Sequence, residues 1–215
     1  MKRFFDIICA LIALTLLSPI FLLTGLMIYI SNPGPILYKA KRVGKFNEVF
    51  SMFKFRSMRV EKGKSENKLT ADGSRIFPFG RFIRRTKLDE LPQIVNILIG
   101  DMSIVGPRPA SIDQVNLVRV GKNTDLSAIK PGLTSPSALY DYMYGDRITD
   151  EAEYRKKVLP TRLALDIEYL NHQSFFYDIQ LILLTVICIF IEILNLNRKG
   201  VIDFLIGKAN ESYYN

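Results

Sequence analysis

The feature that most constrains this chain is a long apolar stretch close to its N-terminus. Residues 7–30, "IICALIALTLLSPIFLLTGLMIYI", contain no charged side chain. As a helix this stretch extends about 36 Å, which is enough to cross the hydrocarbon core of a bilayer. No A-x-A-like cleavage site follows it, which argues against a secretory signal peptide. The sequence therefore predicts a membrane-embedded helix, and a single straight span is its simplest form.

Two details favour a re-entrant helix over a straight span. Ser18 and Pro19 fall at the middle of the stretch, where proline removes a backbone donor and kinks a helix. The serine hydroxyl can satisfy a carbonyl that is freed at such a break. Basic residues, which prefer the cytoplasmic side, flank both ends of the stretch: Lys2 and Arg3 before it, and Lys39, Lys41, Arg42 and Lys45 after it. We expect residues 1–32 to enter and leave the membrane by one face, with the straight span as the rival interpretation.

Positive charge is concentrated directly after the apolar stretch. The chain has a net charge of +8, yet residues 39–87 alone hold 15 Lys and Arg against 4 Asp and Glu. Such a block is typical of a surface that contacts anionic lipid, phosphate or nucleic acid. Because it begins so close to a membrane segment, nucleic acid is not an expected partner.

The sequence lacks the catalytic and binding motifs of several enzyme classes. The chain has one histidine, two cysteines near opposite ends, and neither a GxxxxGK[ST] loop nor a GxSxG elbow. Any chemistry is therefore expected to rest on carboxylates, cations and a metal ion.

Residues 36–56 are expected to form a β-hairpin after the turn-forming residues 32–35. Phe53 and Phe55 alternate with Lys54 and Arg56, so the two cations should share one face of a strand. From spacing alone, two ordinary surface cations are the simpler interpretation. Residues 61–75 are polar and are expected to form a loop.

A short helix is expected to follow this loop and end at Gly100. Its apolar residues recur at the spacing of one helical face: Leu91, Ile94, Val95 and Leu98. Pro92 suits the first turn, where a missing N–H has no consequence.

Asp89 and Glu90 therefore lie at or just before a helix N-terminus, where negative charge is favoured. Plain helix capping explains one acid well and two adjacent acids less well. Magnesium, which proteins hold through one or two carboxylates together with substrate phosphates, explains the pair better. The nearby cations fit phosphate groups: Arg81, Arg84, Arg85 and Lys87.

Two further segments remain open to two interpretations each. Arg108 stands between Pro107 and Pro109, where it suits either a bidentate phosphate clamp or a structural ion pair. Residues 179–194 are apolar but include Glu192, and they are short for a membrane span. We expect a helix that lies at the membrane surface, with a core helix as the alternative.

Seven motifs together resemble the bacterial sugar transferases of the monotopic phosphoglycosyl transferase superfamily. They occur in the expected order over residues 2–187: "KRFFDIICALIALTLLSPIFL", "GPILYKAKRVG", "FKFRSM", "LDELPQIVNILIGDMSIVGPRP", "KPGLT", "LALDIEYL" and "FFYDIQLILLTV". The combination of "LDELPQ" and "GPRP" at this separation is the most specific part of the resemblance.

The resemblance implies an enzyme on the cytoplasmic face of the bacterial inner membrane. Such enzymes move a sugar-1-phosphate from a UDP-sugar to polyprenyl (undecaprenyl) phosphate, release UMP and so initiate glycan assembly on a lipid carrier. By motif match, Asp89 is the nucleophile that forms a covalent phosphosugar intermediate, and Glu90 is the Mg2+ ligand. Ser18 and Pro19 match the break in the membrane helix. The other site residues implied by the match are Lys54, Arg56, Arg108 and Asp166.

The expected fold is thus a mostly helical α+β fold in three parts. These are a re-entrant membrane helix hairpin (1–32), a cytoplasmic catalytic domain with a small β-hairpin and interfacial amphipathic helices (33–198), and a C-terminal tail (199–215). Residues 135–146, "SPSALYDYMYGD", depart from the common family pattern of a glycine and an Ala-Gln pair, so the sugar does not follow from the match. A non-catalytic, membrane-anchored basic lipid-binding scaffold is the alternative, but it leaves Asp89 and Glu90 unexplained.

Overall fold

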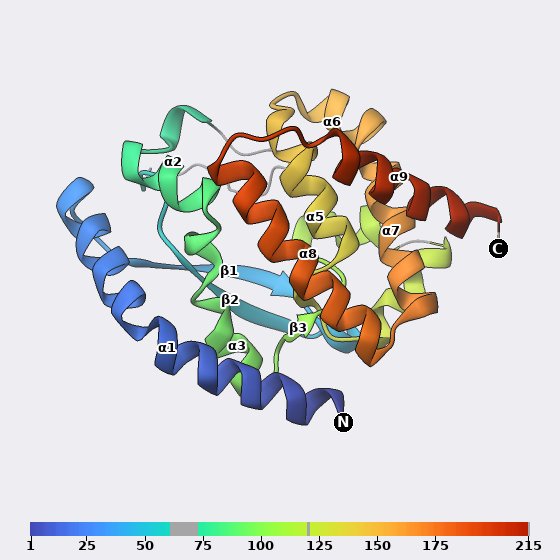
Figure 1. The fold of residues 1–215 in the computed structure, drawn as a ribbon, viewed down its shortest axis with the longest axis horizontal. Coiled ribbons are helices and arrows are strands. Elements are labelled where there is room, and N and C mark those ends of the chain that lie inside the picture. The colour runs from blue at the N-terminus through green and yellow to red at the C-terminus, as the bar shows by residue number, and fades with distance from the viewer. Residues whose placement is uncertain (61–72, 120, 215) are drawn as a thin grey trace.

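The computed structural model describes residues 1–60, 73–119 and 121–214, which form the expected mostly helical α+β fold (Figure 1). The α-helices are α1 (Lys2–Ser31), α2 (Pro78–Arg85), α3 (Gln93–Ile99), α4 (Val115–Val118), α5 (Pro136–Met143), α6 (Glu151–Lys157), α7 (Leu159–His172), α8 (Phe175–Ile193) and α9 (Lys199–Tyr214). The strands are β1 (Leu37–Val43), β2 (Val49–Phe55), β3 (Ser103–Val105), β4 (Ala110–Ser111) and β5 (Gly132–Thr134). Most of the expected loop at 61–75 lies outside the described residues.

The expected hairpin is confirmed and forms the larger of two small sheets. Strands β1 and β2 pair antiparallel with Tyr38 opposite Lys54, and β4 adds to the other edge of β1. Strands β3 and β5 pair in parallel, with Ser103 opposite Gly132. The "GPRP" and "KPGLT" motifs are thereby brought side by side although they are far apart in the sequence.

The apolar stretch forms one continuous helix, α1, that runs through Pro19 and curves along one side of the molecule (Figure 1). Pro19 cannot donate to the carbonyl of Thr15, four residues earlier. The Ser18 hydroxyl donates to that same carbonyl at 2.9 Å, as expected from the sequence. In the described part of the chain, α1 and α8 are the helices long and apolar enough to cross a membrane, by length and composition alone.

One face of α1 packs lengthwise on the rest of the protein. Ala10, Leu14, Leu17 and other apolar residues of this face join a cluster with α3 and the hairpin. Ile28 is buried in a second cluster, whereas many other apolar side chains of α1 are exposed, including Leu11, Ile12, Leu16, Ile20, Leu22, Leu23, Leu26, Met27 and Ile30. The helix therefore lies along the domain and presents an uncovered apolar stripe.

The N-terminal end of α1 is fastened to this domain by polar contacts. The Arg3 guanidinium donates to the carbonyl of Leu98 at 2.7 Å, and Lys2 forms an ion pair with Asp178 of α8. Asp6 is buried and accepts a hydrogen bond from the Ser103 hydroxyl at 2.9 Å. The start of the helix is thus held beside α3, β3 and α8.

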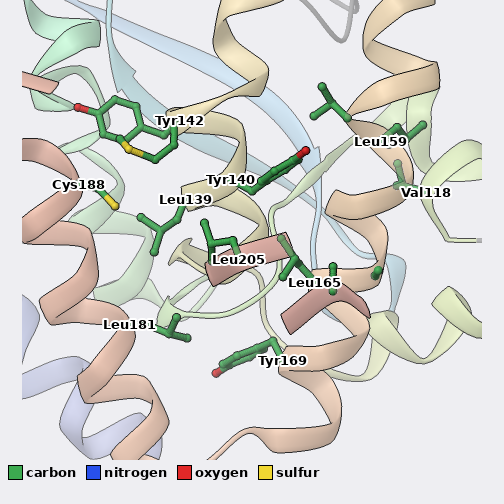
Figure 2. Packing of buried hydrophobic residues seen from close by; sticks show 14 of the residues in the cluster. Val118, Leu139, Tyr140, Tyr142, Leu159, Leu165, Tyr169, Leu181, Cys188 and Leu205 are labelled. Carbon is green, nitrogen blue, oxygen red and sulfur yellow. The ribbon is translucent and has the colours of Figure 1, made fainter. Parts of the chain in front are cut away.

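The largest core lies between α5, α7, α8 and α9 (Figure 2). Figure 2 shows Leu205 of α9 between Leu139 of α5 and Leu165 of α7, and all three are nearly fully buried. Burial of a leucine side chain contributes about 1.5–3 kcal/mol. Residues 199–214, expected only as a tail, therefore complete the core that supports α5.

Candidate functional site

A cavity of about 210 Å³ opens among the hairpin, the turn before α3, the "GPRP" loop, α5 and α7. The charged side chains of its lining include Lys54, Lys87, Glu90 and Arg108, together with Asp141 of α5 and Asp146. The lining also includes Gly132, whose backbone meets that of Gly106. A Cβ added at Gly132 lies 2.1 Å from the Gly106 nitrogen, so only glycine allows the two loops to approach this closely.

Glu90 is the acid of the pair that faces the cavity. It lies in a 3-10 turn, η3 (Leu88–Glu90), directly before α3. Its Oε1 atom accepts from Lys54 Nζ at 2.9 Å and lies 3.8 Å from Lys87 Nζ. Burial favours the neutral acid, but Lys54, Lys87 and Arg108 outweigh this effect and hold the pKa of Glu90 well below its usual range. Glu90 is therefore charged at neutral pH.

Asp89 has the opposite environment. Its side chain is buried, and among the described residues no donor hydrogen-bonds to its Oδ1 atom. Burial and the neighbouring Glu90 charge raise the pKa of Asp89, while Lys54, Lys87 and Arg84 lower it in part. Adjacent carboxyls with divergent pKa values and an unsatisfied buried oxygen are typical of a reactive site rather than of helix capping.

Lys87 connects the two sides of the cavity. Its backbone adopts the left-handed conformation, with φ 57° and ψ 14°, which is strained for a non-glycine residue. Its Nζ atom lies 3.7 Å from Asp146 Oδ2 and 4.4 Å from the ring centroid of Tyr142. Strain of this kind persists where surrounding contacts impose it, and here they place an ammonium between Glu90 and Asp146.

Arg108 is held at the cavity by an acid from α5. Its Nε atom lies 3.7 Å from Asp141 Oδ2, which also lies 3.6 Å from Arg162 of α7. The Tyr154 hydroxyl donates to the other oxygen of Asp141 at 2.5 Å. Burial alone would lower the pKa of Arg108, but the charges of Asp141, Asp146 and Glu90 outweigh burial and raise the pKa overall. The guanidinium therefore stays charged.

Asp166 contacts the backbone of Arg108 from outside the cavity lining. It is buried in α7, accepts a hydrogen bond from the Ser137 hydroxyl and makes a backbone hydrogen bond with Arg108. Burial raises the pKa of Asp166 to about 6, against the opposing effect of Arg162. Asp166 is absent from the cavity lining and instead braces the Arg108 loop.

Arg56 lies elsewhere, although it is only two residues from Lys54. Its guanidinium donates to the Pro35 carbonyl at 2.6 Å and to Asn32 Oδ1 at 2.5 Å. These acceptors follow the C-terminal end of α1, and burial lowers the pKa of Arg56. The structure thus groups Glu90, Lys54 and Arg108 in the cavity lining, with Asp89 buried next to Glu90 in the chain. Neither Asp89 nor Arg56 is among the lining residues, and Arg56 lies at the α1 junction.

Sequence reasoning missed the residues that α5, the turn after it and α7 supply to the cavity. Asp141, Tyr142 and Asp146 lie in the segment that departs from the family pattern, and Arg162 precedes a matched motif. The one available signal was Asp141, a charged residue within an otherwise apolar helix.

The site fits a divalent cation only in company with other ligands. The described residues include no group of three or more His, Cys, Asp or Glu side chains that could hold a metal ion. Magnesium needs no such group, because it takes one or two carboxylates and completes its shell with phosphates and water. A charged Glu90 and the unpartnered oxygen of Asp89 fit that requirement.

Comparison with known proteins connects this geometry to a family. The model of the family described as "Bacterial sugar transferase" matches residues 1–192. The chain is 36% identical over 189 residues to the UDP-glucose:undecaprenyl-phosphate glucose-1-phosphate transferase of Escherichia coli (strain K12), which covers 86% of this chain and 39% of that protein.

Two further relatives show the range of proteins that are similar to this chain. A UDP-N-acetylgalactosamine-undecaprenyl-phosphate N-acetylgalactosaminephosphotransferase of Aeromonas hydrophila is 44% identical over 109 residues, covering 50% of this chain and 26% of that protein. The "Uncharacterized sugar transferase EpsL" of Bacillus subtilis (strain 168) is 33% identical over 186 residues, covering 86% and 85% respectively. The chain therefore spans about two fifths of the Escherichia coli relative and most of the Bacillus subtilis one.

Proposed function

This chain belongs to the bacterial sugar transferase family, and on that premise we propose that it transfers a sugar-1-phosphate from a UDP-sugar to undecaprenyl phosphate and releases UMP. Relatives that are named for this reaction support the proposal. The observation that carries it is the pairing of a buried Asp89 with a charged Glu90 beside a cavity lined by Lys54, Lys87 and Arg108. A site that binds a diphosphate and supplies a carboxylate nucleophile needs both the cations and the acids.

The first step in this proposal is attack by Asp89 on the phosphorus that carries the sugar. A carboxylate oxygen forms a bond to the β-phosphorus, the bond from that phosphorus to the bridging oxygen breaks, and UMP leaves with the electron pair. The product is an aspartyl phosphosugar. Burial destabilises the Asp89 anion and raises its pKa. Bond formation to phosphorus relieves this, because the carboxylate then shares its charge with the phosphoryl group.

The second step regenerates the carboxylate. An oxygen of undecaprenyl phosphate forms a bond to the same phosphorus, and the bond from phosphorus to Asp89 breaks. The lipid then carries a diphosphate-linked sugar, which is the starting point for glycan assembly.

The cations of the site provide positioning and charge stabilisation in both steps. Lys54 and Lys87 pair with Glu90, Arg108 pairs with Asp141, and all three line the cavity in which we place the diphosphate. Glu90 would hold Mg2+, which would neutralise further negative charge of the donor when bound. Arg56 and Asp166 act indirectly in this scheme, the first at the α1 junction and the second behind Arg108.

The same proposal places the protein on one face of the membrane. Arg3 and Asp6 fasten the start of α1 to the domain, and Arg56 fastens its end, so both ends contact the same body. The exposed stripe of α1 then faces lipid, and the basic residues after α1 favour the cytoplasmic side. Cysteines placed at positions 2 and 39 should both be labelled from the cytoplasm. Labelling of position 2 from the periplasm contradicts the re-entrant arrangement.

A UMP-release assay tests the function directly. Purified protein is incubated with Mg2+, undecaprenyl phosphate and each of several UDP-sugars, and UMP is measured against time. We expect release with at least one donor, loss of release in Asp89→Asn, and a weaker response to Mg2+ in Glu90→Gln. No release with any donor favours the lipid-binding scaffold instead.

A further inference from the structure

Asp146 is a carboxylate in the cavity whose role the proposed reaction does not explain. It lies in a 3-10 turn, η6 (Gly145–Arg147), which follows α5, and its side chain is 41% exposed. Its nearest charged partner is Lys87, at 3.7 Å, which is too far for a hydrogen bond. Among the carboxylates that line the described cavity, Glu90 is hydrogen-bonded to Lys54 and Asp141 to Tyr154.

The position of Asp146 is nonetheless fixed by its neighbours. A Cβ added at Gly145 lies 2.4 Å from Asp141 Oδ1, so glycine lets the turn close over Asp141. On the other side, Arg147 forms an ion pair with Glu192 of α8 at 3.3 Å. The Asp146 carboxylate is therefore presented to the cavity from a turn that is anchored on both sides, which lowers the entropy lost on binding.

The charge of Asp146 limits which part of a UDP-sugar it faces. A carboxylate repels phosphate and accepts hydrogen bonds, so it suits a part of the donor that carries hydroxyl or N–H groups. Lys87 lies between Glu90 and Asp146, which puts Asp146 next to the place where the reacting phosphate is held. In a UDP-sugar the sugar is bonded directly to that phosphate, whereas the uracil is separated from it by the ribose and the α-phosphate.

We propose that Asp146 accepts hydrogen bonds from hydroxyl groups of the donor sugar and thereby determines which sugar is transferred. The inference rests on the proposed function, and it concerns the segment that departs from the common family pattern. A site that hydrogen-bonds a substrate hydroxyl discriminates strongly against a donor that presents the hydroxyl elsewhere, because its own polar group is then left unpaired.

The test compares donors that differ at one or two positions of the sugar ring. The value of kcat/KM is measured for UDP-glucose, UDP-galactose and their two N-acetylhexosamine counterparts, with wild type, Asp146→Asn and Asp146→Glu, and UMP is used as an inhibitor. The control is Asp203→Asn, which removes an exposed carboxylate of α9 outside the cavity lining. We expect Asp146→Asn to lower kcat/KM for the preferred donor by about tenfold or more and to lower it less for the epimer.

The remaining outcomes separate the alternatives. In our account the UMP inhibition constant stays unchanged, Asp203→Asn keeps the wild-type preference, and Asp146→Glu also alters the preference because its oxygens are displaced. Equal losses for all donors with weaker UMP inhibition mean that Asp146 binds the nucleotide, which overturns the inference.

A wild-type donor preference in Asp146→Glu also overturns the inference, because it means that only the negative charge beside Lys87 matters. If Asp146→Asn does not fold, Asp146→Glu alone decides. A wild type that releases no UMP with any donor contradicts the proposed function itself.

Discussion

Lys54 and Arg56 lie two residues apart at the end of β2, yet they belong to two different regions of the molecule. Lys54 contacts Glu90 in the cavity, and its side chain is 21% exposed. Arg56 is buried at the end of α1, where it donates to the Pro35 carbonyl and to Asn32. One region holds charges that line an open cavity, and the other holds a buried charge that fastens the end of α1.

In the proposed function, one short motif, "FKFRSM", contributes to catalysis through Lys54 and to the anchoring of α1 through Arg56. In the cavity the ion pairs of Lys87 and Arg108 are 3.7–3.8 Å long, so a diphosphate could replace these contacts in the proposed reaction. The α1 junction satisfies its guanidinium with fixed carbonyl groups, so nothing needs to bind there. Substitutions in the first region should change activity, and substitutions in the second should change stability.

The largest expected effect is the loss of activity in Asp89→Asn. An amide oxygen is a poor nucleophile and carries no charge, so turnover should fall by about 10⁴-fold or more. The measurement is UMP release with saturating UDP-sugar and undecaprenyl phosphate. Donor binding should persist, because Glu90 and the cations remain. Substantial turnover in a correctly folded Asp89→Asn protein contradicts a nucleophilic role.

Arg108→Lys is expected to have the next largest effect. Lysine keeps the charge but cannot form the paired hydrogen bonds of a guanidinium, so kcat/KM should fall by about 10–100-fold. Steady-state kinetics with the preferred donor measure this loss, and a melting curve checks folding. Normal kinetics in Arg108→Lys mean that Arg108 only pairs with Asp141.

A matched pair of substitutions separates the two regions. Lys54→Met should lower kcat/KM by about tenfold or more while it changes the free energy of unfolding by less than about 1 kcal/mol. Arg56→Met should lower the free energy of unfolding by about 2–4 kcal/mol, because buried carbonyls lose a charged donor. Both variants are compared by denaturant unfolding and by UMP release. An Arg56→Met protein of normal stability and low activity places Arg56 in the catalytic group.

The smallest expected effect is a gain in stability in Asp89→Asn. The pKa of Asp89 is raised in the folded protein, so the folded state binds a proton more readily than the unfolded chain. Its charge therefore destabilises the fold as pH rises from the range of an ordinary aspartate through the raised pKa. Asparagine removes this effect, so Asp89→Asn should melt at a higher temperature than wild type at pH 7 and at the same temperature near pH 3. A lower melting temperature at pH 7 contradicts this environment for Asp89.

The sequence was sufficient where the signal was local. The alternation in β2, the apolar stripe that ends at Gly100, and the Ser18 hydroxyl that bonds the carbonyl left free by Pro19 all depend on neighbours within a few residues. The same reasoning placed Asp89 and Glu90 directly before α3.

The sequence was insufficient where long-range packing decides the contact. Strand spacing put Arg56 on the same face as Lys54, but the end of α1 supplies acceptors that draw Arg56 away. Asp141 and Asp146 reach the cavity only because α5 packs between α7, α8 and α9. Within residues 135–146 the charge of Asp141 is a local signal, but it does not show which distant elements meet there.

The central claim is that Asp89 forms a covalent bond to the sugar phosphate, and it is tested most directly without the lipid acceptor. Wild-type protein is mixed with Mg2+ and its preferred UDP-sugar alone, UMP is quantified, and the protein is digested for mass spectrometry. The account predicts up to one equivalent of UMP and a sugar phosphate adduct on the peptide that contains Asp89, with neither in Asp89→Asn. Release of UMP only after undecaprenyl phosphate is added, with no adduct at any time, contradicts the account and indicates direct transfer between the two substrates.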